Sequence, residues 1–367
     1  MSKDRTLGFD PCAVAFFSKG EYLMIGGANK ACILYTKDGV KLGTIGEQNS
    51  WVWCCAARPD TSYIVLGCQD GTIAYYQLIF STVHGLYKER YAFRSVACIP
   101  IDCFDNSLKL SNFRENMTDV IIQHLLTDEK VRIKCRDLVK KIAIYKHRLA
   151  VQLAERIVIY ELYTGAANDA REGGGGGSNM HYRVKEKINQ KVDCNLLVVC
   201  TNHLVLCQEK RLQCLNFRGN KEREWIMESL IRYIKVVGGP PEREGLLIGL
   251  KNGQIMKIFI DNPFPVSLLS INSAVRCLDL SAARQHLAIV DEHSTCQVYS
   301  LKTKELLYQE PNANSVAWNS QFESMLCFSG NNTLSIKAAD FPAHQQKMMG
   351  FVVGFTGSKI FCLHVYR

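Results

Sequence analysis

Short runs of apolar and β-branched residues, each bounded by a turn signal, recur along the whole chain. The clearest case lies between Trp51 and Leu78, where three such runs are separated by Arg58-Pro59-Asp60 and by Gln69-Asp70-Gly71. An Asp-Gly pair between apolar runs favours a tight hairpin, because glycine readily adopts the positive φ that the turn requires. This stretch is therefore predicted to form a small antiparallel meander.

A tetrad of apolar residues, ending in a small or apolar residue in most copies, marks one strand of each repeat. Seven copies occur, and their last residues are separated by steps of 41, 85, 48, 49, 41 and 38 residues. A four-stranded propeller blade needs about 40–45 residues, and runs without polar alternation suit strands that are covered on both faces. The pattern predicts an all-β fold, a seven-bladed WD40-like β-propeller, with eight blades as the alternative. The tetrads are Leu23–Gly26, Ile64–Gly67, Leu149–Gln152, Leu197–Cys200, Leu246–Gly249, Leu287–Val290 and Met325–Phe328.

The step of 85 residues indicates either an additional blade or an insertion. We favour an insertion, because Ser95–Glu115 contains no repeat pattern. The remaining interval then forms one blade, whose outer hairpin pairs Asp119–His124 with Lys130–Cys135. A polar segment at 166–179 contains a run of five glycines, which is typical of a flexible linker. The predicted organisation is one propeller over residues 1–367, interrupted at 95–115 and 166–179.

Other turn signals agree with this repeat alignment. Lys251-Asn252-Gly253 follows the fifth tetrad in the same way that Gln69-Asp70-Gly71 follows the second. A ring of blades needs a closing strand or a direct contact between its end blades. We expect Thr6–Phe9 to supply that strand.

Composition favours an intracellular globular protein. Hydrophobic residues make up 47% of the chain and charged residues 22%, so a sizeable core is possible. No apolar run approaches the ~18 residues of a membrane span, and Met1–Arg5 lacks the apolar core of a signal peptide. Several of the 16 cysteines sit inside apolar runs, where cysteine behaves as a small hydrophobe. A reduced, cytoplasmic protein without a transmembrane segment is expected.

Motifs for catalysis are missing from the sequence. No Gly-Lys-Ser/Thr follows the glycine run, and no Cys-x-x-Cys pair suggests zinc. Regularly spaced cysteines occur, and we favour small core residues over a metal site for them by roughly nine to one. No recognisable nucleophile motif accompanies the histidines, such as His84 and His124. The prediction is a non-enzyme with no catalytic, metal or cofactor-binding residues. The spaced cysteines are Cys194, Cys200, Cys207 and Cys214.

Two tryptophans lie two residues apart on one predicted strand. Trp51 and Trp53 share a face of that strand, because side chains alternate along a strand. We favour core or inter-blade packing over an exposed recognition patch for this pair by roughly three to one.

A basic edge is predicted over residues 130–148, in a chain of formal net charge +9. Apolar residues alternate with basic ones in the strand 130–136, so one side of it is apolar and the other cationic. We give about even odds to the interpretation that these residues form a solvated edge, which blocks strand-to-strand aggregation. An acidic protein partner comes next, then a lipid surface, and nucleic acid is not expected because no aromatic residues interleave with the charges. The candidate partner-binding residues are Arg132, Lys134, Arg136, Lys140 and Lys141.

Six segments are more specific than a generic WD-repeat pattern: Thr36–Trp53, Gly67–Ile73, Gln77–Tyr91, Glu310–Asn319, Gly350–Gly354 and Gly357–Val365. In these segments the chain resembles WD-repeat subunits of intraflagellar transport complex A. The resemblance covers nearly the whole chain apart from Ser95–Glu115 and about 166–179.

Members of this family have two tandem N-terminal propellers followed by TPR-like helical repeats, and this chain resembles the second propeller. The resemblance implies a non-catalytic scaffold for retrograde ciliary transport, cilium assembly and ciliary membrane-protein trafficking. It implies other complex A subunits and ciliary cargo adaptors as partners, at most peripheral membrane association, and a location in the cytoplasm, the cilium and the ciliary base or basal body. The alternative is a propeller that binds anionic lipid or RNA through the basic edge at 130–148.

Overall fold

The chain divides into two compact units, both built from antiparallel strands. The computed structural model describes residues 6–17, 20, 22–37, 39–59, 63–78, 83–94, 98–102, 118–164 and 180–363. Unit 1 comprises Met1–Thr82, Arg114–Asp119 and Lys134–Val139, and the rest of the chain forms unit 2. The all-β prediction is confirmed. The prediction of a single propeller over residues 1–367 stays a prediction.

Unit 1 contains two sheets among its described residues, ordered β1-β2-β3-β4 and β5-β6-β7. Buried side chains from both sheets, including Met24, Val52 and Leu66, form its core. Residues 6–9, predicted to close the ring, form no strand. The strands are β1 (Pro11–Phe17), β2 (Tyr22–Gly27), β3 (Ala31–Thr36), β4 (Lys41–Glu47), β5 (Val52–Ala57), β6 (Tyr63–Cys68) and β7 (Ile73–Gln77).

Unit 2 contains seven sheets among its described residues, of which six have four strands. The first consists of β8 (Val83–Tyr87), β9 (Arg90–Arg94), β11 (Asp119–His124) and β12 (Lys130–Lys134), with the end residues Asp119 and Lys134 assigned to unit 1. The next three sheets consist of β13 (Lys141–Tyr145), β14 (Arg148–Gln152), β15 (Ile157–Thr164), β16 (Met180–Ile188); β17 (Leu196–Val199), β18 (His203–Gln208), β19 (Arg211–Asn216), β20 (Lys221–Ile226); and β21 (Ile231–Gly238), β22 (Gly245–Leu250), β23 (Gln254–Phe259), β24 (Val266–Ser270).

The remaining sheets complete unit 2. Two of them consist of β25 (Val275–Leu280), β26 (His286–Asp291), β27 (Cys296–Ser300), β28 (Leu306–Glu310); and β29 (Ser315–Trp318), β30 (Met325–Gly330), β31 (Thr333–Ala338), β32 (His344–Lys347). The last sheet, ordered β10-β34-β33, consists of β10 (Cys98–Asp102), β33 (Phe351–Thr356) and β34 (Lys359–Leu363). No helix among the described residues is long and apolar enough to cross a membrane.

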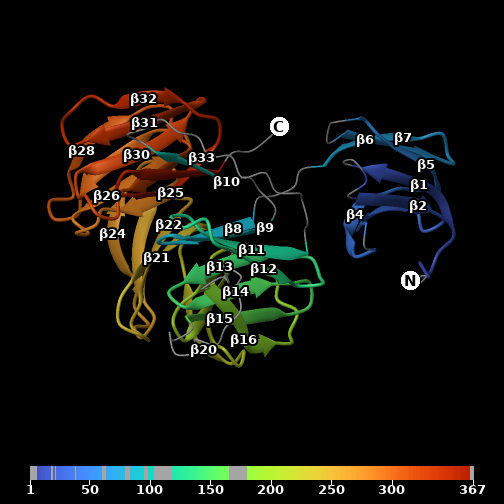
Figure 1. Cartoon of the computed structure of the whole chain (residues 1–367), viewed down its shortest axis with the longest axis horizontal. Helices are drawn as coiled ribbons and strands as arrows, with labels where there is room; N and C mark the ends of the chain where they lie inside the picture. The colour runs from blue at the N-terminus through green and yellow to red at the C-terminus, as the bar shows by residue number, and fades with distance from the viewer. Residues whose placement is uncertain are drawn as a thin grey trace, which may run out of the picture. The chain divides into compact units, whose positions relative to one another are not determined.

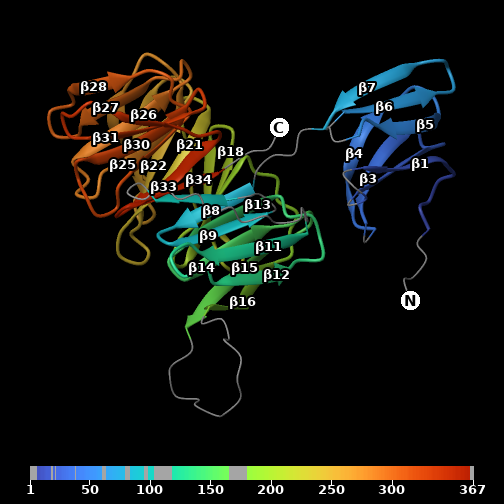
Figure 2. The same ribbon diagram turned by 45° about the horizontal axis from the view of Figure 1, so that its top comes forward.

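The sheets of unit 2 follow one another around a ring. The first strand of each sheet contacts the first strand of the next, in the order β8, β13, β17, β21, β25, β29 and β33. Figure 2 shows the first of these contacts, between β8 in blue-green and β13 in green. The last sheet meets the first through a buried cluster that contains Phe361 of β34, Phe93 of β9 and, at its border, Leu86 of β8. This arrangement is a β-propeller, as the tetrads predicted.

One strand comes from a distant part of the chain. β10 pairs antiparallel with β34, from Cys98 opposite Leu363 to Asp102 opposite Lys359. Figure 1 shows β10 in the same part of unit 2 as β33, which lies on the other side of β34 in this sheet. The prediction that Thr6–Phe9 closes the ring is therefore wrong, because the main-chain groups of β34 that a closing strand would use are paired with β10.

The long interval between the second and third tetrads contains a sheet of its own. Strands β8, β9, β11 and β12 form it, and β10 leaves it to pair elsewhere. The predicted hairpin of Asp119–His124 with Lys130–Cys135 is confirmed as β11 and β12. The other residues of 95–115 and all of 166–179 lie outside the described residues, so their predicted roles as an insertion and a linker stay predictions.

Six of the seven tetrads lie in the second strand of their sheet, and one does not. Leu197–Cys200 belongs to the first strand, β17, and its continuation. The second strand of that sheet, β18, is equally apolar and buried from His203 to Cys207, so the sequence offers two matches there. The predicted hairpin glycines are confirmed, since Gly71 has φ +84° and Gly253 has φ +88°.

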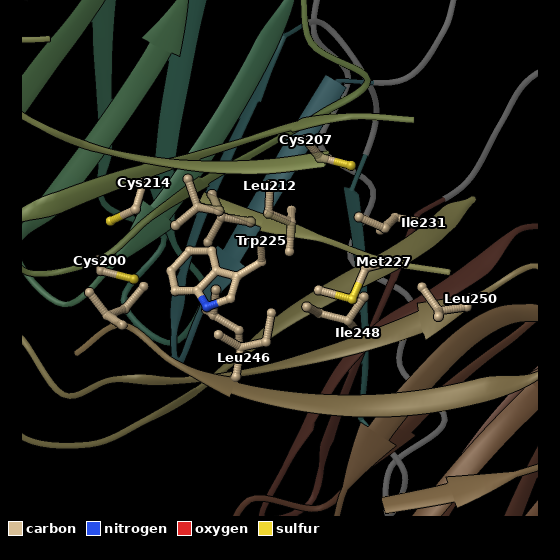
Figure 3. Close-up of a cluster of buried hydrophobic side chains, with 14 residues drawn as sticks. Cys200, Cys207, Leu212, Cys214, Trp225, Met227, Ile231, Leu246, Ile248 and Leu250 are labelled. Carbon is tan, nitrogen blue, oxygen red and sulfur yellow. The ribbon is translucent and has the colours of Figure 1, made fainter. Parts of the chain in front are cut away.

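A buried tryptophan marks the contact between the β17–β20 and β21–β24 sheets. Figure 3 shows Trp225 of β20 surrounded by Leu212, Cys214 and Leu246. Its indole N–H donates to the carbonyl oxygen of Asn262 at 3.0 Å, so the one polar atom of the ring is satisfied. At this interface, side chains of two neighbouring sheets of unit 2 pack against each other and bury the facing sides of both sheets.

Candidate partner-binding surfaces

The predicted alternation along β12 is present. β12 is the outermost strand of its sheet, which runs β12-β11-β9-β8. Lys130, Arg132 and Lys134 are exposed, whereas Val131 and Ile133 are half-buried. The outward cations of an outer strand deter pairing with another chain, and they also present positive charge to a partner.

The three other candidate residues have different surroundings. Arg136 is exposed and has φ +57°, in the bend that follows β12. Lys140 and Lys141 are half-buried at the start of β13, where Lys140 N–H donates to the carbonyl oxygen of Gln152 at 2.8 Å. Burial raises the pKa of the Cys194 thiol to about 11, and the nearby charges of the two lysines oppose that rise.

The structure therefore does not gather the five candidate residues on one described surface. Arg132, Lys140 and Lys141 belong to unit 2, whereas Lys134 and Arg136 fall within unit 1. Alternation identified the β12 side chains because it follows from strand geometry alone. Proximity in sequence did not identify a common surface, because β13 starts a new sheet.

The regularly spaced cysteines are core residues, as predicted. All four are buried, and three of them pack around Trp225. Burial raises the pKa of the Cys207 and Cys214 thiols to about 12, so both stay protonated near neutral pH and are not activated nucleophiles. No group of three or more His, Cys, Asp or Glu side chains in the described part of the chain is arranged to hold a metal ion.

The tryptophan pair of unit 1 is exposed, so the prediction of buried packing is wrong. Trp51 is 38% exposed and Trp53 is 51% exposed, and their ring centroids lie 6.0 Å apart. Tyr75 of β7 is also exposed and stacks on Tyr63 at 5.4 Å. Exposed aromatic groups of this kind favour a contact surface. The two tryptophans do share a face, as the strand period required, and side chains of unit 1 leave both rings partly exposed.

A cavity of about 440 Å³ lies beside the β17–β20 and β21–β24 sheets of unit 2. His203 and Glu222 line it, with His203 Nε2 placed 2.9 Å from Glu222 Oε2. Asn216 donates to the other oxygen of Glu222 at 3.0 Å. These contacts, chiefly the one with His203, hold the pKa of Glu222 below its usual value. Burial raises the pKa of the Cys214 thiol that lines this cavity, so this thiol stays protonated near neutral pH and is not an activated nucleophile.

Hydrogen bonds connect the turns between the first and second strands of successive sheets in unit 2. We call this set of seven turns the turn ring. Its links include Arg90 to the carbonyl of Lys146, Arg148 to that of Thr201 at 2.9 Å, and Asn319 to that of Gly357 at 2.7 Å. These hydrogen bonds therefore tie several of the seven turns to their neighbours through polar contacts.

Three cations stand at the tips of these turns in the left-handed backbone region. Lys88 has φ +50°, Lys146 has φ +47° and Arg284 has φ +60°. Glycine or asparagine adopts this conformation at lower cost than lysine or arginine. Sequence reasoning missed these residues; the usable signal was a basic residue where a turn glycine or asparagine is expected. We call Lys88, Lys146 and Arg284 the turn cations.

Comparisons with known proteins agree with the fold. The family model described as the IFT122 second beta-propeller matches residues 109–367. The chain is 64% identical over 366 residues to proteins named intraflagellar transport protein 122 homolog from Xenopus tropicalis and from Homo sapiens. The protein of that name from Danio rerio is 62% identical over 366 residues.

Each of these matches covers 100% of this chain but only 27–28% of the relative. The chain therefore spans a little over a quarter of the length of the curated relatives that it matches. Residues 1–108, which include all of the strands β1 to β7, lie outside the range of the family model.

Proposed function

Because the chain belongs to the IFT122 second beta-propeller family, we propose that it is a non-catalytic WD-repeat part of an intraflagellar transport complex A subunit. The observation that carries this proposal is the 64% identity, which extends over the full length of the chain. A propeller suits a scaffold, since its rigid sheets present many turns at two broad ends.

The finer role that we propose is a protein-interaction scaffold in retrograde ciliary transport, cilium assembly and ciliary membrane-protein trafficking. Its partners would be other complex A subunits and ciliary cargo adaptors, at the cilium and the ciliary base. The exposed aromatic face of unit 1 and the exposed cations of β12 support this role, because both are surfaces that contact other molecules in many proteins.

A replacement experiment tests the proposal. In ciliated cells lacking the endogenous relative, the matching segment of the full-length relative is replaced with this chain. We expect cilia and retrograde transport to be restored, and complex A subunits to co-purify with the chimera. A control chimera carries Trp225→Ala, which removes a buried side chain of unit 2. A folded, expressed chimera that restores neither cilia nor co-purification would reject the proposed role.

The β12 cations provide a second candidate mode, binding of anionic lipid or RNA. Their exposure is the observation that favours it. Reversing Arg132, Lys134 and Arg136 to glutamate would then abolish a steeply salt-dependent affinity for phosphatidylserine vesicles or RNA. The matched control reverses exposed cations elsewhere, Lys302 and Lys304. Equal weak binding by both variants and by the unmodified chain would remove this candidate.

A further inference from the structure

Four cations of the turn ring of unit 2, Lys88, Arg90, Lys146 and Arg284, form no direct ion pair with a described carboxylate. Lys146 Nζ donates to the carbonyl oxygen of Gly239 at 3.1 Å, and Arg284 donates to that of Val237 at 2.7 Å. Arg90 donates to the carbonyl oxygen of Lys146 and also to the hydroxyl oxygen of Tyr182, the latter at 3.1 Å. Backbone carbonyls orient Arg90, Lys146 and Arg284 without a direct contact to a described carboxylate.

Two tyrosines interleave with these cations. The rings of Tyr87 and Tyr145 meet edge to face at 5.1 Å. Lys88 Nζ lies 5.9 Å from the centroid of the Tyr87 ring, and Lys146 Nζ lies 5.3 Å from that of Tyr145. Since aromatic faces attract cations, these contacts limit the positions that the two ammonium groups adopt. The charges are thus held in place on separate turns.

The charge pattern is discontinuous. Glu89 and Glu242 share turns with Lys88 and with Gly239, and Asn202 donates to Glu242 at 3.2 Å. Glu244 is fully buried beneath the surface and accepts the N–H of Thr201 at 3.0 Å. A continuous line of phosphates or a flat anionic bilayer would meet Glu89 and Glu242 as well as the cations. A short peptide can place its own carboxylates only at the cationic points.

We propose that the turn ring binds an acidic peptide segment of a protein partner, with Lys88, Arg90, Lys146 and Arg284 as the groups that contact its carboxylates. This inference goes beyond the proposed function, because it does not depend on membership of a transport complex. It also places the binding charge on a different surface from the β12 cations.

The positive φ values permit a variant that removes charge without straining the backbone. Lys88→Gly, Lys146→Gly and Arg284→Gly are made together in the full chain. Because glycine adopts positive φ without steric cost, the turns are expected to be kept and thermal stability to stay close to that of the unmodified chain. Circular dichroism and thermal unfolding check this before binding is measured.

A matched control exists in the same chain. Lys30 and Lys304 have φ values of +58° and +66° and lie outside the turn ring, and Lys302 is an exposed cation beside Lys304. Lys304 even donates to a main-chain carbonyl, that of Leu268, at 2.7 Å, as the turn cations do. The triple change of these residues to glycine removes the same formal charge, and two of the three residues have the same backbone conformation as the turn cations. The two variants therefore differ in the location of the lost charge.

Binding is measured by fluorescence anisotropy with a labelled oligo-glutamate peptide, and with oligo-glutamine as the uncharged comparison. We expect the turn-ring variant to lose affinity for oligo-glutamate by about tenfold, and the control variant to change little. Equal losses of affinity for oligo-glutamate in both variants would show that only net charge matters, and this would overturn the proposal. So would absence of binding to the unmodified chain, or tighter binding to single-stranded RNA or phosphatidylserine vesicles than to the peptide.

Discussion

The last sheet of unit 1 and the sheets of unit 2 are built from similar apolar strands but differ in what covers them. In unit 2 all residues of Leu246–Gly249 are buried, because neighbouring sheets lie on both of its faces. In unit 1 the β5-β6-β7 sheet buries Val52 and Leu66 on one side. On the other side Ile73 is 77% exposed and Tyr75 is 64% exposed. A strand's apolar content thus measures its capacity for burial, and a neighbouring surface determines whether that capacity is used.

The largest difference between the units is expected at their tryptophans. Trp225→Ala should lower the free energy of unfolding of unit 2 by about 3–5 kcal/mol, since it leaves a cavity among buried side chains. Trp53→Ala is the matched substitution in unit 1, and it should cost below about 1 kcal/mol because the ring is half exposed. Urea unfolding followed by circular dichroism measures both. Similar losses for the two variants would contradict the contrast between a covered and an uncovered sheet.

The hairpin at Gly71 tests whether unit 1 depends on its turns. Gly71→Val should destabilise unit 1 by about 1 kcal/mol or more, because valine strongly disfavours the observed φ of +84°. Gly43→Val is the control, since an added Cβ at Gly43 meets no atom within 4 Å and its φ is not positive. Thermal unfolding compares them. An unchanged melting temperature for Gly71→Val would contradict the view that this turn requires a residue that readily adopts positive φ.

An acid titration tests how much the ionised Glu161 side chain contributes to the stability of unit 2. Hydrogen bonding and charge from Arg148, with smaller help from Arg183, hold the pKa of Glu161 at about 2, below its ordinary 4.5. Because the folded pKa is depressed, the contribution of Glu161 is present above pH 4.5 and is lost as pH falls toward 2.

Glu161→Gln should therefore destabilise the protein near neutral pH, by about 1 kcal/mol or less, and flatten this part of the pH profile. Glu155→Gln serves as the control, because the side chain of Glu155 is 69% exposed and lies 3.9 Å from Lys191. Urea unfolding at a series of pH values measures the profiles. A Glu161→Gln profile that parallels that of the unmodified chain would exclude this carboxylate as the cause.

The smallest effect on folding is expected at the exposed face of unit 1. Ile73→Thr with Tyr75→Thr should change the free energy of unfolding by about 0.5 kcal/mol or less, since both residues are largely exposed and threonine suits a strand. The same change should reduce binding of a hydrophobic dye and weaken self-association in light scattering. Unchanged dye binding would show that this face is not an accessible apolar surface.

Local signals in the sequence predicted local structure well. Gly71 and Gly253 were identified because an Asx-Gly pair has few other uses between apolar runs. The exposed cations of β12 followed from the two-residue period of a strand. The tetrads found the buried strands, although Leu197–Cys200 was matched to the wrong strand because β17 and β18 are equally apolar.

Properties that depend on distant residues could not be predicted from these signals. Nothing in the sequence of 98–102 marks it as the partner of β34, since main-chain pairing across the chain leaves no periodic trace. The exposure of Trp53 depends on which residues pack near its strand and not on the strand's own sequence. The turn ring joins Lys146 and Arg284 through backbone carbonyls, which every sequence offers equally.

The pairing of β10 with β34 also governs the order of events during synthesis. β10 leaves the ribosome early, whereas its partner at Lys359–Leu363 is translated after every other described strand. Until then the nascent propeller has an open sheet edge and an uncovered apolar surface at Tyr91 and Phe93, which later contact Phe361. Such non-local pairing slows folding, so that edge stays open to association with other chains for as long as the intervening sheets are being translated.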